Sequence, residues 1–391
     1  MKMIITLIVL MMYLLSCHKE SATNGSNSSV FTIKIPSKYT FLYNVIHNEK
    51  NGNVLFQVGD NNRLIFHLLL VDVKTGSVLK TLDSIPRVGG IACNGSSYFL
   101  TRFISSKLVV EQYDENLNKI KQSQNLANIQ VSNSWQSYPL INKNGTLSLL
   151  STYTSYIYIL RHQFDKDLNL LKTDSSGNTN GWYGIASLNA ATQLDDGSYI
   201  MALRNLGTQG GVLGHIFEKR DKDFKIIWAK KADDSKGLLY TNKIINDGGG
   251  NFLMAGNVLL KENPSTDYDS YLLRIDGNGN TLGEKVISTP WLDVRNVYVE
   301  KTSNNGYIYC MMSSNGKVTN YSTQLTGFDS EMKPLWSKTV GGTKSVNYYP
   351  ALIKLEPNRH LLAYLDNSFL NSGGGFNLVY KFIDDNGELS N

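Results

Sequence analysis

The sequence predicts an all-β fold built from a repeated four-stranded unit, and three observations lead to this prediction. Short runs rich in β-branched and aromatic residues alternate with turn clusters of Asn, Asp and Gly, as in hairpins. No 3.6-residue pattern with helix caps interrupts them. A motif anchored by an Asp recurs at intervals of 42, 51, 56, 55, 53 and 55 residues, and periods of this size indicate stacked or radial repeats. The seven anchors are Asp72, Asp114, Asp165, Asp221, Asp276, Asp329 and Asp384.

Residues 1–16 have the pattern of a secretory signal peptide. Lys2 precedes an apolar run from Met3 to Leu15 that is too short to span a membrane as a helix. The end of the run, Leu14-Leu15-Ser16-Cys17, resembles the lipobox of bacterial lipoproteins. The resemblance implies that Cys17 is diacylated on its sulfur and attaches the protein to a membrane, since each buried CH₂ contributes about 0.8 kcal/mol. The alternative is an ordinary cleaved signal with a Cys beside it by chance.

Residues 17–29 are small and polar, which predicts a flexible tether after the lipidated Cys. His18 stands where the inner-membrane retention signal of lipoproteins has Asp, so the resemblance favours the outer membrane. Lys19-Glu20 weakly matches the acidic cluster that directs some lipoproteins to the cell surface. The sequence therefore predicts a lipid-anchored envelope protein and leaves the periplasmic and surface sides open.

The charge excludes one class of partner. The formal net charge is +5 over 391 residues and no basic run appears, so nucleic acid is not a predicted partner. The histidines have no metal-ligand spacing and no C-x-x-C occurs, so neither a metal nor another cofactor is predicted.

Each period contains a second hairpin before the anchored one. Two hairpins make a four-stranded unit with strands A to D, and seven units predict a seven-bladed β-propeller over residues 30–391, which leaves little exposed sheet edge. The last unit ends at Gly387–Asn391, while an unpaired β-like run spans Val30–Ile35. We therefore expect this run to supply the outer strand of the seventh blade and close the ring. Examples of the second hairpin are Tyr138–Thr152, Ala190–Leu203 and Val297–Met311.

The anchored stretch Asp276–Ile287 opens like a calcium loop, with oxygen-bearing side chains at its first, third and fifth positions. An EF-hand needs Gly at the sixth position and Glu at the twelfth, where this chain has Thr281 and Ile287. A hairpin turn that exploits the tolerance of Asn and Gly for positive φ is the favoured interpretation.

The predicted fold also decides the pairing of the remaining cysteines. Cys93 falls in the second blade and Cys310 in the sixth, so their Cα atoms lie beyond the roughly 7 Å limit for a disulfide. Both are expected to be small packing residues.

The two faces of the predicted propeller differ. The A–B and C–D turns are tight, whereas the B–C and D–A connections are long and irregular, as at residues 205–214, 261–269 and 367–375. Binding sites concentrate on long loops over a rigid scaffold, so the long-loop face is the predicted binding face.

Aromatic residues stand just before several inner strands, near the predicted mouth of the central channel, and can stack on sugars or grip a peptide. The alternative is that they pack between blades, which is the expectation for Trp228 and Trp336 on outer strands. Tyr39 is a further match in the first blade. The candidate ligand-binding residues are Trp135, Tyr138, Trp182, Tyr183, Tyr240, Trp291, Tyr348 and Tyr349.

No linear catalytic motif is found, and acidic pairs such as Asp195-Asp196 fall in turns. The mature chain resembles Gram-negative lipoproteins built from a repeat propeller, whose blades end in strand, Asp-x-x-Gly/Asn turn, strand, often with Trp as in L-W-S-K. The resemblance implies a non-catalytic binding or scaffolding protein for a protein or glycan ligand. The alternative is a polysaccharide hydrolase or lyase with its site in the channel, which acidic, His or Arg side chains clustered there would favour.

Overall fold

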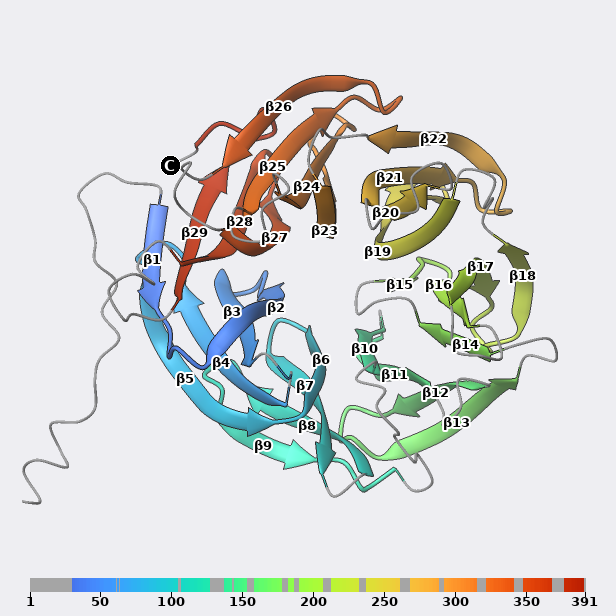
Figure 1. The fold of residues 1–391 in the computed structure, drawn as a ribbon. Helices are drawn as coiled ribbons and strands as arrows, with labels where there is room; N and C mark the ends of the chain where they lie inside the picture. The colour runs from blue at the N-terminus through green and yellow to red at the C-terminus, as the bar shows by residue number, and fades with distance from the viewer. Residues whose placement is uncertain are drawn as a thin grey trace, which may run out of the picture.

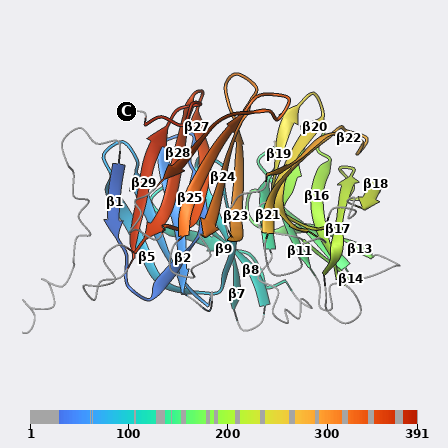
Figure 2. The same cartoon turned by 45° about the horizontal axis from the view of Figure 1, so that its top comes forward.

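A computed structural model describes residues 30–391 except 61, 63, 105–106, 127–136, 143, 153–157, 178–181, 186–189, 207–211, 232–236, 261–267, 288–291, 315–320, 341–346, 368–375 and 390–391. Its strands form seven antiparallel sheets arranged as blades around a central axis (Figure 1), which confirms the predicted all-β seven-bladed propeller. The strands run between the two faces of the ring (Figure 2). No helix in the described part of the chain is long and apolar enough to cross a membrane.

The first three blades follow the predicted A-to-D order from the axis outward. Blade one contains β2 (Tyr39–His47), β3 (Asn53–Asp60), β4 (Ile65–Asp72) and β5 (Ser77–Pro86). Blade two contains β6 (Val88–Cys93), β7 (Ser97–Ile104), β8 (Lys107–Asp114) and β9 (Lys119–Gln122). Blade three contains β10 (Ser137–Ile141), β11 (Leu147–Thr152), β12 (Tyr158–Phe164) and β13 (Leu170–Gly177).

Blade four departs from this order because its inner strand is split into two pieces. It contains β14 (Trp182–Ile185), β15 (Ala191–Gln193), β16 (Tyr199–Leu206), β17 (Val212–Arg220) and β18 (Ile226–Lys231). Both β14 and β15 pair with β16, β14 toward its loop end and β15 toward its turn end. Figure 1 shows β14 farther from the axis than β15.

The next two blades are regular. Blade five contains β19 (Gly237–Gly248), β20 (Asn251–Leu260), β21 (Tyr268–Ile275) and β22 (Thr281–Ile287). Blade six contains β23 (Leu292–Lys301), β24 (Tyr307–Ser314), β25 (Tyr321–Phe328) and β26 (Pro334–Val340).

The seventh blade is assembled from both ends of the described chain. It contains β27 (Asn347–Glu356), β28 (Arg359–Asp366), β29 (Asn377–Ile383) and, outermost, β1 (Val30–Lys34). The register pairs Val30 with Lys381 and Lys34 with Asn377, as expected for an N-terminal strand that completes this blade. Ile33 of β1 is buried in the core between blades seven and one. Phe31 stacks on Tyr380 of β29 at 4.9 Å between ring centroids.

The core is divided into seven apolar clusters, and each cluster lies between two neighbouring blades. The cluster between blades one and two, for example, joins Phe66 and Leu68 to Ile91 and Tyr98. Each fully buried side chain of this kind contributes about 1.5–3 kcal/mol. Because the last cluster joins blade seven to blade one, the stabilisation runs around the whole ring.

The anchored Asp turns share one hydrogen-bond pattern. In Asp276, Oδ1 accepts the backbone N–H groups of Asn278 at 2.9 Å and Asn280 at 2.7 Å. Six anchors accept N–H groups two and four residues ahead in this way, and Asp72 accepts the N–H of Lys74 and the hydroxyl of Thr75. The carboxylate caps the turn, which confirms the turn interpretation. Within the described residues, no group of three or more His, Cys, Asp or Glu is placed to hold a metal ion.

The third residue after each of six anchors adopts positive φ and meets the preceding blade. Four of these residues are bulky and buried, namely Leu117, Leu168, Phe224 and Met332. Where the position holds Gly, a Trp of the preceding outer strand fills the space. A Cβ added at Gly279 would lie 3.0 Å from Trp228, and one at Gly387 would lie 2.5 Å from Trp336. Trp228 and Trp336 are therefore packing residues, as predicted.

Cys93 and Cys310 are both free thiols, in agreement with the prediction that the blades keep them apart. Cys310 is fully buried and Cys93 is half-buried. Burial raises the pKa of the Cys93 thiol, which keeps it protonated at neutral pH.

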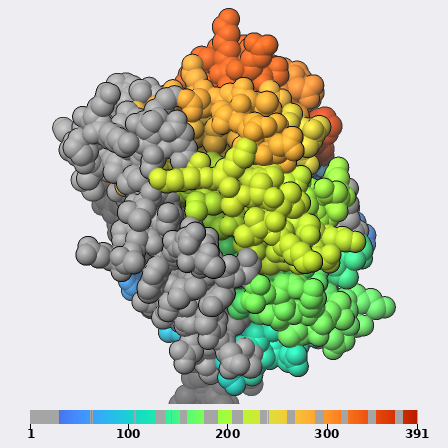
Figure 3. All heavy atoms as spheres, turned by 90° about the vertical axis from the view of Figure 1, so that its right-hand side faces the viewer, coloured from blue at the N-terminus to red at the C-terminus, as the bar shows by residue number. Residues whose placement is uncertain are grey.

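The outer wall, part of which faces the viewer in Figure 3, carries half-exposed aliphatic residues on the outer strands of six blades. They are spread over the six blades rather than gathered into one patch, which is the scattered exposure that folded proteins ordinarily show. They are Leu79, Ile120, Leu171, Ile226, Ile227, Leu282 and Leu335.

Candidate functional site

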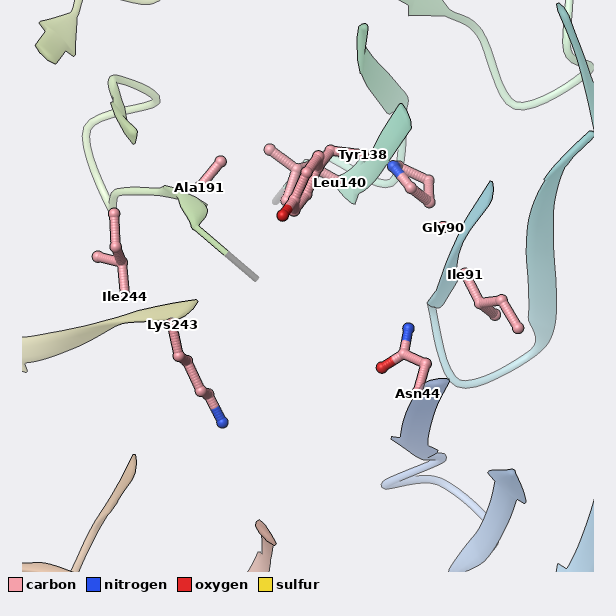
Figure 4. A pocket seen from close by; sticks show the side chains of 9 residues that line it. Asn44, Gly90, Ile91, Tyr138, Leu140, Ala191, Lys243 and Ile244 are labelled. Carbon is pink, nitrogen blue, oxygen red and sulfur yellow. The ribbon is translucent and has the colours of Figure 1, made fainter. Parts of the chain in front are cut away.

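A cavity of about 140 Å³ opens into the central channel between the inner strands of the first five blades. Asn44 of β2 and Lys243 of β19 extend into it from opposite sides, and Tyr138 and Leu140 of β10 form part of the wall (Figure 4). The remaining lining residues are Gly90, Ile91, Pro139, Ala191 and Ile244. The cavity thus combines aliphatic side chains with polar groups, and polar atoms contribute more of its accessible surface than apolar atoms do.

The wall of the cavity depends on a close approach between blades two and three. A Cβ added at Gly90 would lie 2.5 Å from both the carbonyl oxygen of Ser137 and Cδ of Pro139, so no larger residue fits there. The N–H of Gly90 donates to Oγ1 of Thr101 at 2.8 Å, and Thr101 and Ser137 share a hydrogen bond of 2.5 Å. These contacts fix the inner strands β6 and β10 relative to each other.

Two polar side chains of the cavity keep unused hydrogen-bonding capacity. Asn44 is 6% exposed, and its Oδ1 accepts the N–H of Val45 at 3.0 Å. Among the described residues no acceptor pairs with its Nδ2. The ammonium of Lys243 forms an ion pair with Glu300 of β23 and lies 5.8 Å from the centre of the Tyr298 ring. An ammonium has three N–H donors, so the ion pair leaves part of its capacity open.

Tyr138 is the predicted ligand residue that the structure describes most fully. It is 3% exposed and packs in the cluster between blades three and four, and its hydroxyl accepts the N–H of Ala190 at 3.2 Å. Tyr138 is therefore mainly a wedge between blades, and it reaches the cavity as part of the wall.

Tyr349 also packs between blades. It has φ of 52°, and its ring lies 4.2 Å from that of Phe41 between blades seven and one. The left-handed backbone of a bulky residue is costly and persists only where packing holds it. The side chain of Tyr349 is thus held against the first blade.

The other candidates are placed only by their backbone or lie outside the described residues. Trp182 and Tyr183 lie on β14, Tyr240 on β19 and Tyr348 on β27. In blade four it is β15, with Ala191, that reaches the cavity. Trp135 and Trp291 fall outside the described ranges.

A polar cluster at the loop end of blade one was missed by the sequence analysis, which noted only Tyr39. The hydroxyl of Tyr39 donates to Asp83, whose Oδ1 also lies 3.1 Å from Nδ1 of His67. Lys38 forms a salt bridge of 3.3 Å with the same carboxylate. These residues come from separate segments of the chain, and no local spacing signals their meeting.

The electrostatics of this cluster do not suit acid–base catalysis at neutral pH. Burial alone would raise the pKa of Asp83, but hydrogen bonds from Tyr39, Ser84 and Lys38 lower it to about 2. Burial, together with the hydrogen bond to Asp83, raises the pKa of Tyr39, and burial lowers the pKa of His67. Asp83 is therefore ionised and Tyr39 protonated at neutral pH. Their hydrogen bond joins the outer strand β5 to the start of β2.

Two fully buried carboxylates lie on third strands rather than at the channel. Glu111 of β8 accepts hydrogen bonds from Lys119 at 2.6 Å, Tyr113 at 2.8 Å and Arg102 at 3.1 Å. Burial opposes ionisation of Glu111, but these donors lower its pKa. Glu218 of β17 pairs with Arg220 at 2.5 Å. Both carboxylates are saturated by their partners and contribute to the blades rather than to a channel site.

The fold is shared with solved structures of low sequence identity. A polysaccharide lyase of the PL25 ulvan lyase family matches with a TM-score of 0.60 and 10% identity over 91% of this chain and 96% of that one. The same type of lyase bound to a -[GlcA(1-4)Rha3S]- ligand matches with a TM-score of 0.59, 10% identity and coverage of 90% and 96%. A protein of unknown function from Dyadobacter fermentans matches with a TM-score of 0.50, 12% identity and coverage of 90% and 97%. No protein-family model and no curated protein matches the chain. The structural likeness establishes the propeller fold.

Proposed function

We propose that this protein is an envelope-anchored, non-catalytic binding lipoprotein that holds a glycan at the channel. The observation that carries the proposal is the channel cavity, where Asn44 and Lys243 offer hydrogen-bond donors beside aliphatic side chains. Sugars present hydroxyl oxygens and apolar C–H faces together, so such a mixed lining suits them. The propeller structures of polysaccharide lyases lend support at the level of fold.

The anchor in this proposal is Cys17, after a signal peptide at residues 1–16 and at the start of a tether over 17–29. The register of β1 supports an orientation in which the tight-turn end of the propeller lies toward the anchor. Val30 pairs with Lys381, close to the anchored turn after Ile383, so the chain enters the propeller at the tight-turn end. An anchor attached there leaves the long-loop face on the opposite side, free to meet a ligand. The outer membrane is the proposed site, on either its periplasmic or its surface side.

Two other functions remain in contention. One is a polysaccharide hydrolase or lyase, favoured by the likeness to the ulvan lyases. The other is binding of a protein partner by the long-loop face, favoured by the length of the B–C and D–A connections. Product analysis after incubation with polysaccharides distinguishes the first, because a binding protein returns the polymer unchanged.

Metabolic labelling with palmitate tests the anchor. The wild-type chain is expected to take up label and to fractionate with membranes, and Cys17→Ser is expected to lose both properties. Cys93→Ser is the matched control and should keep both, because its thiol lies within the propeller. Label retained by Cys17→Ser would contradict the proposed lipidation.

A glycan array probed with the full chain, together with a pulldown from solubilised envelope, tests the binding function. The proposal predicts glycans that bind the array and are not shortened by the protein. Capture of a protein partner with no glycan bound would replace the glycan with a protein ligand. Shortened glycans would establish the hydrolase or lyase instead.

A further inference from the structure

We propose that the channel cavity recognises the terminal ring of an uncharged glycan rather than an acidic sugar. This inference rests on the proposed glycan-binding function and adds the class of ligand. It is carried by the pairing state of the polar groups in the cavity, by the nature of its wall and by its size.

Asn44 supplies a donor that has no acceptor among the described residues. The residue is 6% exposed, its Oδ1 is occupied by the N–H of Val45, and its amide faces the open space (Figure 4). Nδ2 is not sealed from solvent, so a ligand oxygen placed there takes the place of a water molecule. The ligand atom that can pair with Nδ2 of Asn44 is an acceptor such as a hydroxyl or ring oxygen.

Lys243 supplies further donors but little net charge. Its ammonium is already paired with the carboxylate of Glu300, and both side chains are 15% exposed. A ligand carboxylate drawn to Lys243 would lie beside the carboxylate of Glu300, and like charges in a partly buried site repel. A hydroxyl avoids this conflict because it can accept from Lys243 and donate to Glu300 at once.

Four aliphatic side chains lie beside these polar groups. Ile91, Leu140, Ala191 and Ile244 line the cavity, and three of them are less than a tenth exposed. They offer a surface for the C–H face of a sugar ring.

The size of the cavity points to the end of a glycan chain. Its volume of about 140 Å³ corresponds to roughly five waters at liquid density and lies below the roughly 300 Å³ at which typical ligand pockets begin. A single ring therefore enters, while the remainder of the chain extends along the channel.

The test compares neutral and acidic ligands of equal length on the full chain. Short oligosaccharides of galactose and of galacturonic acid, titrated by calorimetry, are the first probes, followed by neutral and uronate members of a glycan array. The expected result is binding of a neutral oligosaccharide at least roughly tenfold tighter than its uronate counterpart, as a charge conflict of this kind predicts. Saturation-transfer NMR should show the terminal ring receiving the strongest signal.

Three variants locate the site. Asn44→Ala and Lys243→Met should each weaken neutral-glycan binding by roughly tenfold, because each removes donors from the ligand. Glu300→Gln keeps the shape of the side chain but leaves the Lys243 charge unpaired, so the preference should move toward uronates. Lys354→Met is the matched control, since Lys354 is also an inner-strand cation but donates to the carbonyl oxygen of Lys301 at 2.9 Å. Thermal melts establish that each variant is folded, and Asn44→Ala keeps the test valid if Lys243→Met is not.

The outcomes separate the two proposals. A wild-type protein that prefers uronates, or neutral-glycan binding that survives both Asn44→Ala and Lys243→Met, overturns the inference and leaves the proposed glycan-binding function standing. A wild-type protein that binds no glycan of either charge overturns both.

Discussion

The two ends of the blades differ in how their structure is specified. At the tight-turn end, the same Asp cap recurs and its carboxylate accepts the same two backbone N–H groups, as in Asp114 and Asp276. At the loop end, each blade has its own connection, and the polar cluster around Asp83 occurs in blade one only within the described part of the chain. The comparison indicates that the turn end stabilises the ring, whereas the loop end and channel are free to vary with the ligand.

Removal of β1 should produce the largest loss of stability. Deletion of residues 30–34 exposes the edge of β29 and removes Ile33 from the core between blades seven and one. We expect a loss of about 3 kcal/mol or more in the free energy of unfolding, measured by urea denaturation, because one buried aliphatic side chain and a strand ladder are lost together. Deletion of residues 22–26 in the predicted tether is the control and should leave the free energy unchanged. An equal effect of the two deletions would sink the idea that β1 closes the ring.

A change of side-chain size at Trp336 or Gly387, which meet between neighbouring blades, should give the next largest loss of stability. Gly387→Leu places a side chain against Trp336 and should cost about 2 kcal/mol through overpacking. Blades five and six show the reverse arrangement, in which a Cβ on Gly283 would lie 2.7 Å from Met332. Trp336→Gly together with Gly387→Leu should therefore cost less than the sum of the single changes, by about 1 kcal/mol or more in a double-mutant cycle. Strict additivity would show that the two residues do not pack as a pair.

Loss of one Asp cap should have a smaller effect. Asp221→Ala removes the acceptor of the N–H groups of Asp223 and Lys225, and we expect a loss of about 1 kcal/mol, comparable to that of a helix cap. Asp223→Ala in the same turn is the control and should change stability by less than about 0.5 kcal/mol, because its side chain caps no backbone group in the described structure. Chemical denaturation measures the stability of both variants. Similar losses would show that Asp221 does not stabilise the turn more than Asp223 does.

Loss of the Asp83 carboxylate at the loop end should have the smallest effect on stability, and this effect should depend on pH. The pKa of Asp83 is lowered to about 2 from the ordinary value of 3.8, so its stabilising effect is complete above about pH 4 and is lost as the pH falls toward 2. Asp83→Asn should lower the melting temperature between pH 5 and 7. The difference from wild type should shrink as the pH falls from about 4 to about 2. A difference that persists at pH 2 would indicate lost packing rather than lost charge.

The ring of blades could be predicted from the sequence because the contacts that define each anchored turn are local. Each anchor Asp contacts N–H groups two and four residues away, so the motif is visible in a short stretch and its seven copies count the blades. The position of β1 followed from an unpaired β-like run at one end of the repeats and a missing strand at the other.

The site could be predicted only in part because its contacts are distant in the sequence. Lys243 and Glu300 are 57 residues apart, and Tyr39 and Asp83 are 44 apart, so neither pair leaves a local pattern. The aromatic residues before the inner strands were a local signal, but a ring near the axis can face either a neighbouring blade or the channel. Tyr138 and Tyr349 pack between blades, and the inner strand of blade four is split, with Trp182 and Tyr183 on β14 and the cavity-lining Ala191 on β15.

Hydrogen exchange of the full chain with and without a neutral galactose oligosaccharide tests the division between the two ends most directly. The account predicts slower exchange in the inner strands that line the cavity, namely β2, β6, β10, β15 and β19, and unchanged exchange in the anchored turns that follow Asp114, Asp221 and Asp276. Slower exchange confined to those turns, with the inner strands unchanged, would contradict it.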